Sequence, residues 1–353
     1  MSLGVGIIGA GMIARIHARA INRLDGMQLV GVMDNGRGKS QDIAPGTNPK
    51  GAGDLNVFLS RDDIDLVSIA TPSGTHADIA ELAAAHGKHV ICEKPLDITS
   101  GAMDRMINAC RDANVRLGGI FNTRYTEGAQ LLKRAREQGR FGRLTFGQAF
   151  CPWWRDQAYY DSSGWKGTWA MDGGGALMNQ GIHSVDLLQW TMGSPVIRIS
   201  ANIATLAHNN LEVEDTASAS LQFANGALGI IAGTTSIWPG HYRTITLAGT
   251  DGTAVLADGN LLEWRFRDET EQDQLIRKRH GGLPGAGVGA SDPSASVDSD
   301  GHLAAFSEFL DAIKDRRQPR VDGREAKKSV EIILAIYESA RLGGQPVRPN
   351  LKS

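Results

Sequence analysis

The sequence lacks the features of several protein classes. It has 353 residues but only three cysteines, Cys92, Cys110 and Cys151, which are too few and too widely spaced for a disulfide framework or a zinc site. Apolar runs stay below the roughly 18 residues of a membrane span. The N-terminus has no basic segment followed by an apolar core, so no signal peptide is predicted. We therefore expect reduced thiols and a cytoplasmic location.

An excess of charge of one sign is also absent. Lysine and arginine number 37 against 39 aspartate and glutamate residues, which gives a formal net charge of −2, and no basic block stands out. Neither nucleic acid nor a membrane is therefore expected as a partner. Proline is scarce at 12 residues and no Gly-X-Y period occurs, which excludes a collagen-like or low-complexity chain.

Glycine, in contrast, is abundant. The chain has 43 glycines in 353 residues, well above the roughly 7% of an average protein. Hydrophobic residues at 41% and charged residues at 22% are ordinary for a globular protein. At roughly 150 residues per domain, the length favours two domains. The glycines must serve local backbone requirements, so their positions mark turns and close approaches.

The first 121 residues alternate between short apolar runs and helical patterns. The predicted strands are residues 5–8, 29–33, 66–70, 89–92 and 116–120, and the predicted helices are 13–24, 77–86 and 101–113. Nearly continuous apolar strands that alternate with helices predict a parallel sheet with helices on both faces.

The rest of the chain follows a second pattern. Segments 143–151 and 195–267 indicate strands joined by tight turns, with Asn225-Gly226, Asp251-Gly252 and Asp258-Gly259 as two-residue hairpin signals. This pattern predicts a mainly antiparallel sheet. Helices are expected at 176–192, 303–314 and 325–342, and a surface loop at 281–300. The predicted fold is therefore an α/β domain over 1–121 and an α+β domain over 122–353.

A glycine motif follows the first predicted strand. The segment Gly9-Ala10-Gly11-Met12-Ile13-Ala14 reads G-x-G-x-x-A, in which Gly9 permits the tight turn and Gly11 lets the backbone approach a pyrophosphate. Asp34 ends the second strand, where a carboxylate accepts hydrogen bonds from ribose hydroxyls. The predicted cofactor residues here are Gly9, Gly11, Met12, Ile13 and Asp34. Asp34 repels a 2′-phosphate, so NAD is favoured over NADP, while Arg37 keeps NADP open. Glycines that serve packing alone are the alternative.

Four further segments follow in a fixed order. They are Thr71-Pro72-Ser73-Gly74-Thr75-His76, Glu93-Lys94-Pro95, Phe121-Asn122-Thr123-Arg124-Tyr125 and residues 173–183, GGGALMNQGIH. With the glycine motif, they resemble the glucose-fructose oxidoreductase / inositol dehydrogenase / rhizopine catabolism (Gfo/Idh/MocA) oxidoreductase family over nearly the whole chain. The resemblance implies a Rossmann domain followed by an open-faced sheet domain with helices on one face. It also implies an NAD(P)-dependent dehydrogenase that acts on a secondary hydroxyl or ketone of a sugar, polyol or (nucleotide-)sugar acid, and a homodimer or homotetramer paired through the sheet.

Lys94 and His183 are the predicted catalytic residues. Lys94 follows a parallel strand, where open α/β sheets place ligands, and the resemblance brings this lysine to the reacting hydroxyl, whose oxygen an ammonium polarises. Histidine exchanges a proton near neutral pH, so His183 is the predicted base. A solvated lysine and a core histidine paired with Asp186 are the alternatives. Asn179 shares the helix face of His183 at i, i+4.

Asn179 also departs from the family pattern, which often has Asp here. An amide cannot serve as a base, but it can bind a substrate hydroxyl. In this respect the chain resembles family members that oxidise nucleotide-linked amino-sugar acids.

The remaining candidates line the predicted site. The resemblance adds Thr71, Pro72, His76, Glu93 and Lys94 to the cofactor residues. The predicted substrate residues are Arg124, Tyr125, Arg155, Tyr160, Trp165, Asn179, His183 and His241. Aromatic faces stack on sugar rings and arginine binds carboxylates or phosphates, although a structural flap is the alternative for segment 153–169. No metal site is predicted, because the histidines are scattered along the chain.

Two other functions stay open. One is NAD-dependent glycoside hydrolysis, in which hydride is borrowed and returned, as in some members of the resembling family. The other is a non-catalytic dinucleotide-binding sugar sensor, against which the presence of both Lys94 and His183 argues.

Overall fold

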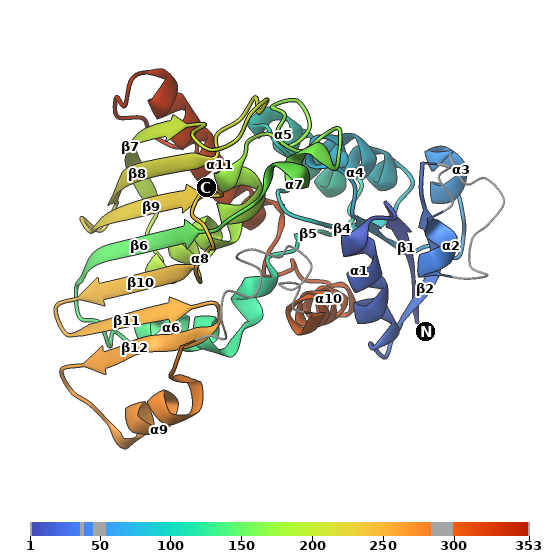
Figure 1. Ribbon diagram of the computed structural model, residues 1–353. Helices are drawn as coiled ribbons and strands as arrows, with labels where there is room; N and C mark the ends of the chain where they lie inside the picture. Colours follow the sequence, from blue (N-terminus) through green and yellow to red (C-terminus); the bar gives the residue numbers. More distant parts are fainter. Residues whose placement is uncertain (1, 36–38, 45–53, 284–298, 352–353) are drawn as a thin grey trace. The chain divides into compact units, whose positions relative to one another are not determined.

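The computed structural model describes residues 2–35, 39–44, 54–283 and 299–351, and it divides into two compact units (Figure 1). The first unit runs to Asn122 and also contains α10 and the residues after it up to Lys327. The second runs from Thr123 through α9 and includes the chain from Lys328 onward. The predicted fold class, a parallel sheet domain plus a mainly antiparallel one, is confirmed.

The first unit holds a five-stranded parallel sheet in the order β2-β1-β3-β4-β5. Its strands are β1 (Leu3–Ile8), β2 (Met27–Met33), β3 (Leu66–Ile69), β4 (His89–Cys92) and β5 (Leu117–Gly119), and its first helices are α1 (Met12–Asn22), α2 (Ser40–Ile43), α3 (Leu55–Leu59), α4 (His76–Ala85) and α5 (Ser100–Asp112). Every predicted strand and helix of this part is present. The short helices α2 and α3 were not predicted.

Helix α10 (Ser299–Lys314) packs against α1 in the first unit. The ring of Phe306 lies 5.3 Å from that of His17, and a Cβ added to Gly118 of β5 would lie 2.7 Å from Phe309. From the sequence, this helix was expected in the second domain. An amphipathic pattern shows that a helix has an apolar face, but it does not show which sheet that face covers.

The second unit holds a seven-stranded sheet in the order β12-β11-β10-β6-β9-β8-β7, in which only the β6–β9 pair is parallel. Its strands are β6 (Leu144–Pro152), β7 (Val196–Ala204), β8 (Thr216–Phe223), β9 (Leu228–Thr234), β10 (Thr244–Gly249), β11 (Gly252–Ala257) and β12 (Asn260–Phe266). Its helices are α6 (Glu127–Glu137), α7 (Gln157–Asp161), α8 (Ile182–Met192), α9 (Glu271–His280) and most of α11 (Gly323–Arg341). Helices α6, α7 and α9 were not predicted.

One of the three hairpin signals is confirmed and two are corrected. Neither Asp251 nor Gly252 has a positive φ, and the last β10–β11 pair, Ala248 with Thr253, leaves a loop of four residues, so a two-residue turn at Asp251-Gly252 is wrong. Asp258 and Gly259 both have positive φ, +42° and +99°, as a two-residue turn requires. In Asn225-Gly226, Gly226 has φ +87° while Asn225 stays outside the left-handed region. The N–H of Phe223 donates to the carbonyl of Ala227, so this loop has three residues, and the two-residue interpretation is wrong.

Helices cover one face of the second sheet. Helix α8 packs on β6 and β10, and α6 packs on β11 (Figure 1). On the opposite face, Leu228 and Ile230 of β9 are 58% and 41% exposed. Their strand partners Phe146 and Gln148 of β6 share that face and are partly exposed.

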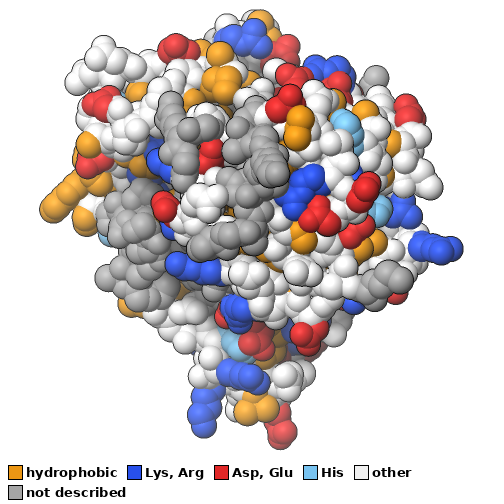
Figure 2. All heavy atoms as spheres, turned by 90° about the vertical axis from the view of Figure 1, so that its right-hand side faces the viewer, with side chains coloured by type: hydrophobic (Ala, Val, Ile, Leu, Met, Phe, Trp, Pro, Cys, Tyr) orange, Lys and Arg blue, Asp and Glu red, His pale blue; other side chains and the backbone are white. Residues whose placement is uncertain are grey.

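Several predictions concern the surface and the thiols. Cys92, Cys110 and Cys151 are buried and free. Among the described residues, no helix has the length and apolar character needed to cross a membrane. Acidic and basic side chains are intermingled on the face shown in Figure 2. Most of the loop predicted at 281–300 lies outside the described residues, as does Arg37.

Candidate active site

The glycine turn after β1 joins the strand to α1. Gly9 has φ +107°, and a Cβ there would lie 2.3 Å from the carbonyl oxygen of Ala70, so no other residue fits without a backbone shift. Gly11 differs, because a Cβ there would meet no atom within 4 Å and the residue is exposed. Packing therefore explains Gly9 but not Gly11, whose bare backbone is accessible to a ligand.

The N-terminus of α1 is open to an anion. Its N-cap residue, Gly11, has no side chain to cap the helix, and the first turn contains no acidic residue. The first N–H groups and the positive end of the helix dipole are thus available for a phosphate. Met12 is 50% exposed at this end. Asp34 follows β2 and is held by the backbone N–H of Ser40, which donates to Oδ2 at 2.8 Å. These residues fit a dinucleotide.

Three loops leave the same edge of the first sheet. Strands β1, β3 and β4 are adjacent and parallel, so Gly9, Thr71 and Lys94, which follow them, lie along their carboxyl ends. The predicted cofactor residue His76 is buried, and its ring nitrogens lie 2.9 Å from the carbonyl oxygen of Pro95 and 3.0 Å from that of Thr71. His76 therefore joins two of these loops to each other. Lys94 is partly exposed.

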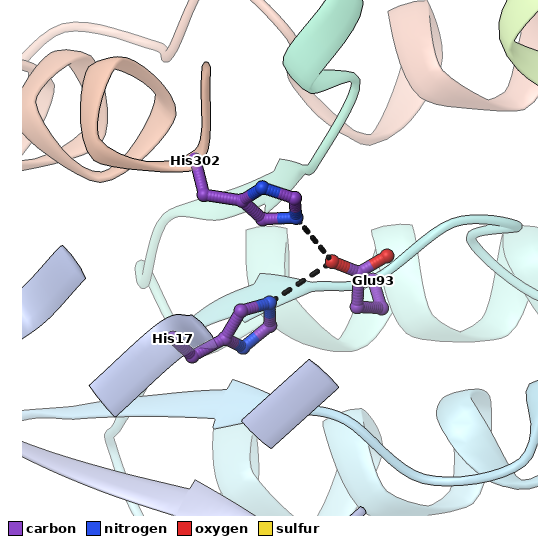
Figure 3. Close-up of side chains that lie close together, drawn as sticks. All are labelled: His17, Glu93 and His302. Atoms are coloured by element: carbon purple, nitrogen blue, oxygen red, sulfur yellow. Dashed lines mark hydrogen bonds and ion pairs between the residues drawn. The ribbon is translucent and has the colours of Figure 1, made fainter. Parts of the chain in front are cut away.

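Glu93 lies at the centre of a buried cluster with His17 and His302 (Figure 3). Its Oε1 lies 2.9 Å from Nε2 of His17 and 3.2 Å from Nε2 of His302, while Oε2 accepts the N–H of Lys94 at 3.0 Å. Burial by itself raises the pKa of Glu93, but the histidine hydrogen bonds outweigh it and hold the pKa well below its usual range.

The histidines are far apart along the chain, so no metal site was predicted from the sequence. The structure brings three potential ligands together: one atom each of His17, Glu93 and His302 lies within 4.8 Å of the other two, so the cluster could hold a metal ion. Each histidine occupies the apolar stripe of its helix. A polar side chain on a buried helix face needs a hydrogen-bond partner. The position of each histidine was therefore a signal for this cluster that the sequence contained and the prediction missed.

The predicted helix 176–192 begins as a π-helix over Ala176–Gly181 and continues as α8. Such turns are rare and often occur at functional sites. Because the π turn changes the rotation per residue, the α-helical i, i+4 relation of Asn179 and His183 does not apply through it. Both side chains are partly exposed.

Glu214 holds the start of this π-helix. Its two carboxylate oxygens accept the N–H groups of Gly175 and Leu177, both at 2.9 Å, and Tyr337 donates its hydroxyl to Oε1 at 2.9 Å. A Cβ on Gly174 would lie 2.1 Å from the Tyr337 hydroxyl oxygen, so this glycine serves packing. Burial raises the pKa of Glu214 to about 7. Glu214 was not among the residues predicted from the sequence.

Arg124, a predicted substrate residue, is paired with a buried carboxylate. Its Nε and Nη2 donate to the two carboxylate oxygens of Asp186, both at 2.6 Å, and both side chains are buried. The guanidinium also lies 5.2 Å from the ring centre of Trp190. Arg124 thus fixes α8, and Asp186, which the sequence offered only as an alternative partner of His183, binds Arg124.

A polar network connects the aromatic segment to the π-helix. Arg155 donates to Oε1 of Gln180 at 3.0 Å, and the Gln180 amide donates to Oδ1 of Asn179 at 3.0 Å and to the hydroxyl of Tyr159 at 2.7 Å. The Asn179 amide in turn donates to Asp172 at 2.6 Å. Asp172, which lies outside the motifs, and Gln180, which lies within segment 173–183, were not among the predicted site residues.

Tyr160, another predicted substrate residue, makes its hydrogen bond outside the polar network. It is buried, and its hydroxyl lies 2.8 Å from Oγ1 of Thr235, so it belongs to the core of the second unit. The adjacent Tyr159 joins the polar network instead. Of the other predicted substrate residues, Tyr125 and Trp165 are partly exposed and His241 is exposed.

Comparisons with known proteins cover both units. Residues 3–121 match the model of an oxidoreductase family with an NAD-binding Rossmann fold, and residues 129–255 match the GFO/IDH/MocA C-terminal domain. The chain is 34% identical to the WlbA dehydrogenase of Bordetella pertussis, solved in complex with NADH and UDP-GlcNAcA, with a TM-score of 0.89 over 99% of each chain.

Two further relatives span almost the full length. The WlbA dehydrogenase of Chromobacterium violaceum, also solved with NADH and UDP-GlcNAcA, is 32% identical with a TM-score of 0.88 over 100% of this chain and 97% of its own. A myo-inositol 2-dehydrogenase of Thermotoga maritima is 25% identical over 95% of each chain.

Proposed function

The chain belongs to the GFO/IDH/MocA family of NAD-binding oxidoreductases, and on this premise we propose that it transfers hydride to or from a secondary hydroxyl or ketone of a nucleotide-linked sugar acid. One structural observation carries the proposal: Lys94 follows β4 at the sheet edge that also bears the glycine turn. The substrate class is supported by the two WlbA dehydrogenases and by Asn179 in place of the frequent family aspartate.

NAD is the proposed cofactor, with Gly11 and the α1 N-terminus at the pyrophosphate and Asp34 at the ribose. When bound, NAD supplies the nicotinamide ring that accepts or returns hydride. Asp34→Ser is expected to raise the KM for NAD about tenfold or more and to reduce discrimination against NADP, because the carboxylate repels a 2′-phosphate. Steady-state kinetics with both cofactors measure this. An unchanged NAD/NADP preference would contradict the role of Asp34.

The chemistry is assigned to Lys94 and His183. The Lys94 ammonium polarises the substrate oxygen and stabilises its alkoxide character, and the His183 imidazole takes the hydroxyl proton. Asn179, fixed by Asp172, binds a neighbouring hydroxyl through its amide. Arg155 supplies a buried positive charge beside Tyr159, with its guanidinium 5.5 Å from the ring centre.

The test is a substrate panel. UDP-GlcNAcA, UDP-GlcNAc, myo-inositol and levoglucosan are each incubated with enzyme and NAD, and NADH is followed by absorbance. The proposal expects turnover with UDP-GlcNAcA and at least about tenfold less with UDP-GlcNAc, which lacks the carboxylate. A clear preference for myo-inositol or levoglucosan would refute the proposed substrate class but leave the oxidoreductase assignment intact.

Variants then test the catalytic residues. Lys94→Ala and His183→Ala are each expected to lower kcat about 100-fold or more, with NADH binding retained. Lys314→Ala, which changes an exposed lysine of the first unit, is the matched control and should leave kcat unchanged. Wild-type turnover by Lys94→Ala would refute the mechanism.

The same assays separate the two open alternatives. A glycoside hydrolase would release an aglycone without net NADH, whereas a dehydrogenase accumulates NADH with its sugar. A sensor would bind NADH and show no turnover with any member of the panel.

We also propose that two copies of the chain pair through the open face of the second sheet. Leu228 and Ile230 are exposed there, and Phe146 and Phe150 of β6 share the face. A row of apolar side chains on an uncovered sheet favours burial against a second copy.

A further inference from the structure

Glu93 receives hydrogen bonds from two histidines of different helices. His17 lies in α1 and His302 lies in α10, and both Nε2 atoms point at the same carboxylate oxygen, Oε1 (Figure 3). The three residues are 0%, 3% and 6% exposed for His17, His302 and Glu93 respectively, so water does not compete for these contacts. All three belong to the first unit.

The chemistry of the partners fixes the direction of each hydrogen bond. An ionised carboxylate only accepts, so both histidines present Nε2–H to Glu93, and in a neutral ring Nδ1 is then an acceptor. Nδ1 of His17 lies 2.8 Å from the hydroxyl oxygen of Ser68, and Nδ1 of His302 lies 3.5 Å from the amide nitrogen of Asn122. Both of these groups can donate. Two neutral histidines in the Nε2–H form therefore satisfy the whole cluster.

The other carboxylate oxygen connects the cluster to Lys94. Oε2 of Glu93 accepts the backbone N–H of Lys94, so the carboxylate takes donors on both oxygens. Burial lowers the pKa of His17, which keeps its ring neutral, while the pKa of Glu93 is held low. With both histidines in the neutral Nε2–H form, the cluster carries one negative charge, on Glu93, directly beside the proposed catalytic lysine.

We infer that His17 and His302 are positioning residues that hold Glu93 as a fixed anion against the backbone of Lys94. This inference rests on the proposed function, because it gives the cluster a role in the reaction of Lys94. It also explains why α10 belongs to the first unit: the helix delivers the second histidine to the loop after β4. Without either donor, the buried carboxylate loses a hydrogen bond that stabilises its negative charge, so it takes up a proton more readily.

The same geometry distinguishes hydrogen bonding from metal ligation. A metal-bound histidine donates its second ring N–H to an acceptor. Here the amide nitrogen of Asn122, a donor, faces Nδ1 of His302. The cluster therefore fits two N–H donors on a carboxylate better than three ligands around an ion.

The kinetic test uses paired substitutions at each histidine. His302→Leu and His17→Leu remove the donor, whereas His302→Gln and His17→Gln keep a side-chain N–H. We expect each leucine variant to lose about tenfold in kcat near pH 6 and to recover to within about threefold of wild type near pH 9, where Glu93 is ionised again. The glutamine variants should keep the wild-type pH profile. Leu310→Ala changes another buried residue of α10 and controls for loosening of the helix. Its kcat should show no additional loss at low pH compared with wild type.

A second readout does not depend on turnover. Nitrogen-15 NMR of histidine-labelled wild-type protein should show His17 and His302 as neutral Nε2–H tautomers at about pH 7. If the substrate panel gives no turnover, the proposed function fails while this spectrum still tests the cluster. Leucine variants whose pH profiles parallel wild type, protonated Nδ1 atoms, or one equivalent of bound zinc that is lost in His302→Leu would each overturn the inference.

Discussion

Arg124 donates two hydrogen bonds of 2.6 Å to the carboxylate of Asp186, and the side chains are only 3% and 0% exposed. The pair joins the segment before α6 to the middle of α8, the helix that carries His183. Arg124, which was predicted from the sequence to lie beside a substrate, thus holds two segments of the second unit together. Because this ion pair is buried, removal of either residue would leave the other charge in the core without its partner, which is strongly unfavourable.

Removal of one partner of this pair should destabilise the protein. Asp186→Asn and Arg124→Met are each expected to lower the free energy of unfolding by about 3 kcal/mol or more, since each leaves the other polar group buried without its counter-charge. Denaturant titration measures this. The double variant should cost less than the sum of the single variants. If Arg124→Met instead raises the substrate KM with unchanged stability, Arg124 binds substrate after all.

The two glycines of the first turn should respond differently to alanine. Gly9→Ala must move the backbone at Ala70 and adopt an unfavourable φ, so we expect a stability loss of at least about 1–3 kcal/mol. Gly11→Ala has open space for its Cβ and should keep the wild-type Tm, yet weaken NADH binding about tenfold or more. Calorimetry and NADH fluorescence titration separate the two effects. Wild-type NADH affinity in Gly11→Ala would exclude this backbone as a phosphate contact.

Glu214 predicts a pH dependence of stability. Its folded-state pKa, raised by burial to about 7, exceeds the unfolded value, so the folded state binds the proton more tightly. The resulting stabilisation is fully present below the unfolded pKa and is lost as pH rises to about 7, by about 3 kcal/mol in total. The Tm of wild type should therefore fall over this range relative to Glu214→Gln.

Glu212→Gln is the matched control for this pH dependence, since Glu212 is exposed and only two residues away. Its Tm should follow wild type at each pH. A Glu214→Gln profile parallel to wild type would show that Glu214 does not titrate in this window.

A charge on the open sheet face should prevent pairing of the chain. Ile230→Glu is expected to shift wild-type oligomers to monomers in light scattering after size-exclusion chromatography, because it would bury a carboxylate in the contact. Leu275→Glu changes a more exposed apolar residue on α9 and should leave the assembly intact. A monomeric wild-type protein, or dissociation by Leu275→Glu alone, would contradict the proposed contact.

The fold was predictable wherever local sequence sets local structure. The apolar runs of the first 121 residues give all five strands of the parallel sheet, and Asp258-Gly259 gives its hairpin. Prediction failed where contacts between residues distant in the sequence decide the local structure. The three-residue loop at Asn225-Gly226 depends on strand register, and the π turn at Asn179 depends on the cap that Glu214 provides. Helix α9 was missed because its helical period carries few apolar residues.

The sequence by itself determined the two sheets, the glycine turn at Gly9 and the place of Lys94 at the end of a strand, because each depends on residues that are adjacent in the sequence. Only the tertiary structure decided the polar clusters. His302 reaches Glu93 across 209 positions and Arg124 reaches Asp186 across 62, and no local pattern encodes either pairing. Both pairings form only when whole helices pack on a sheet. A buried charge is stable only where that packing brings a complementary group to it.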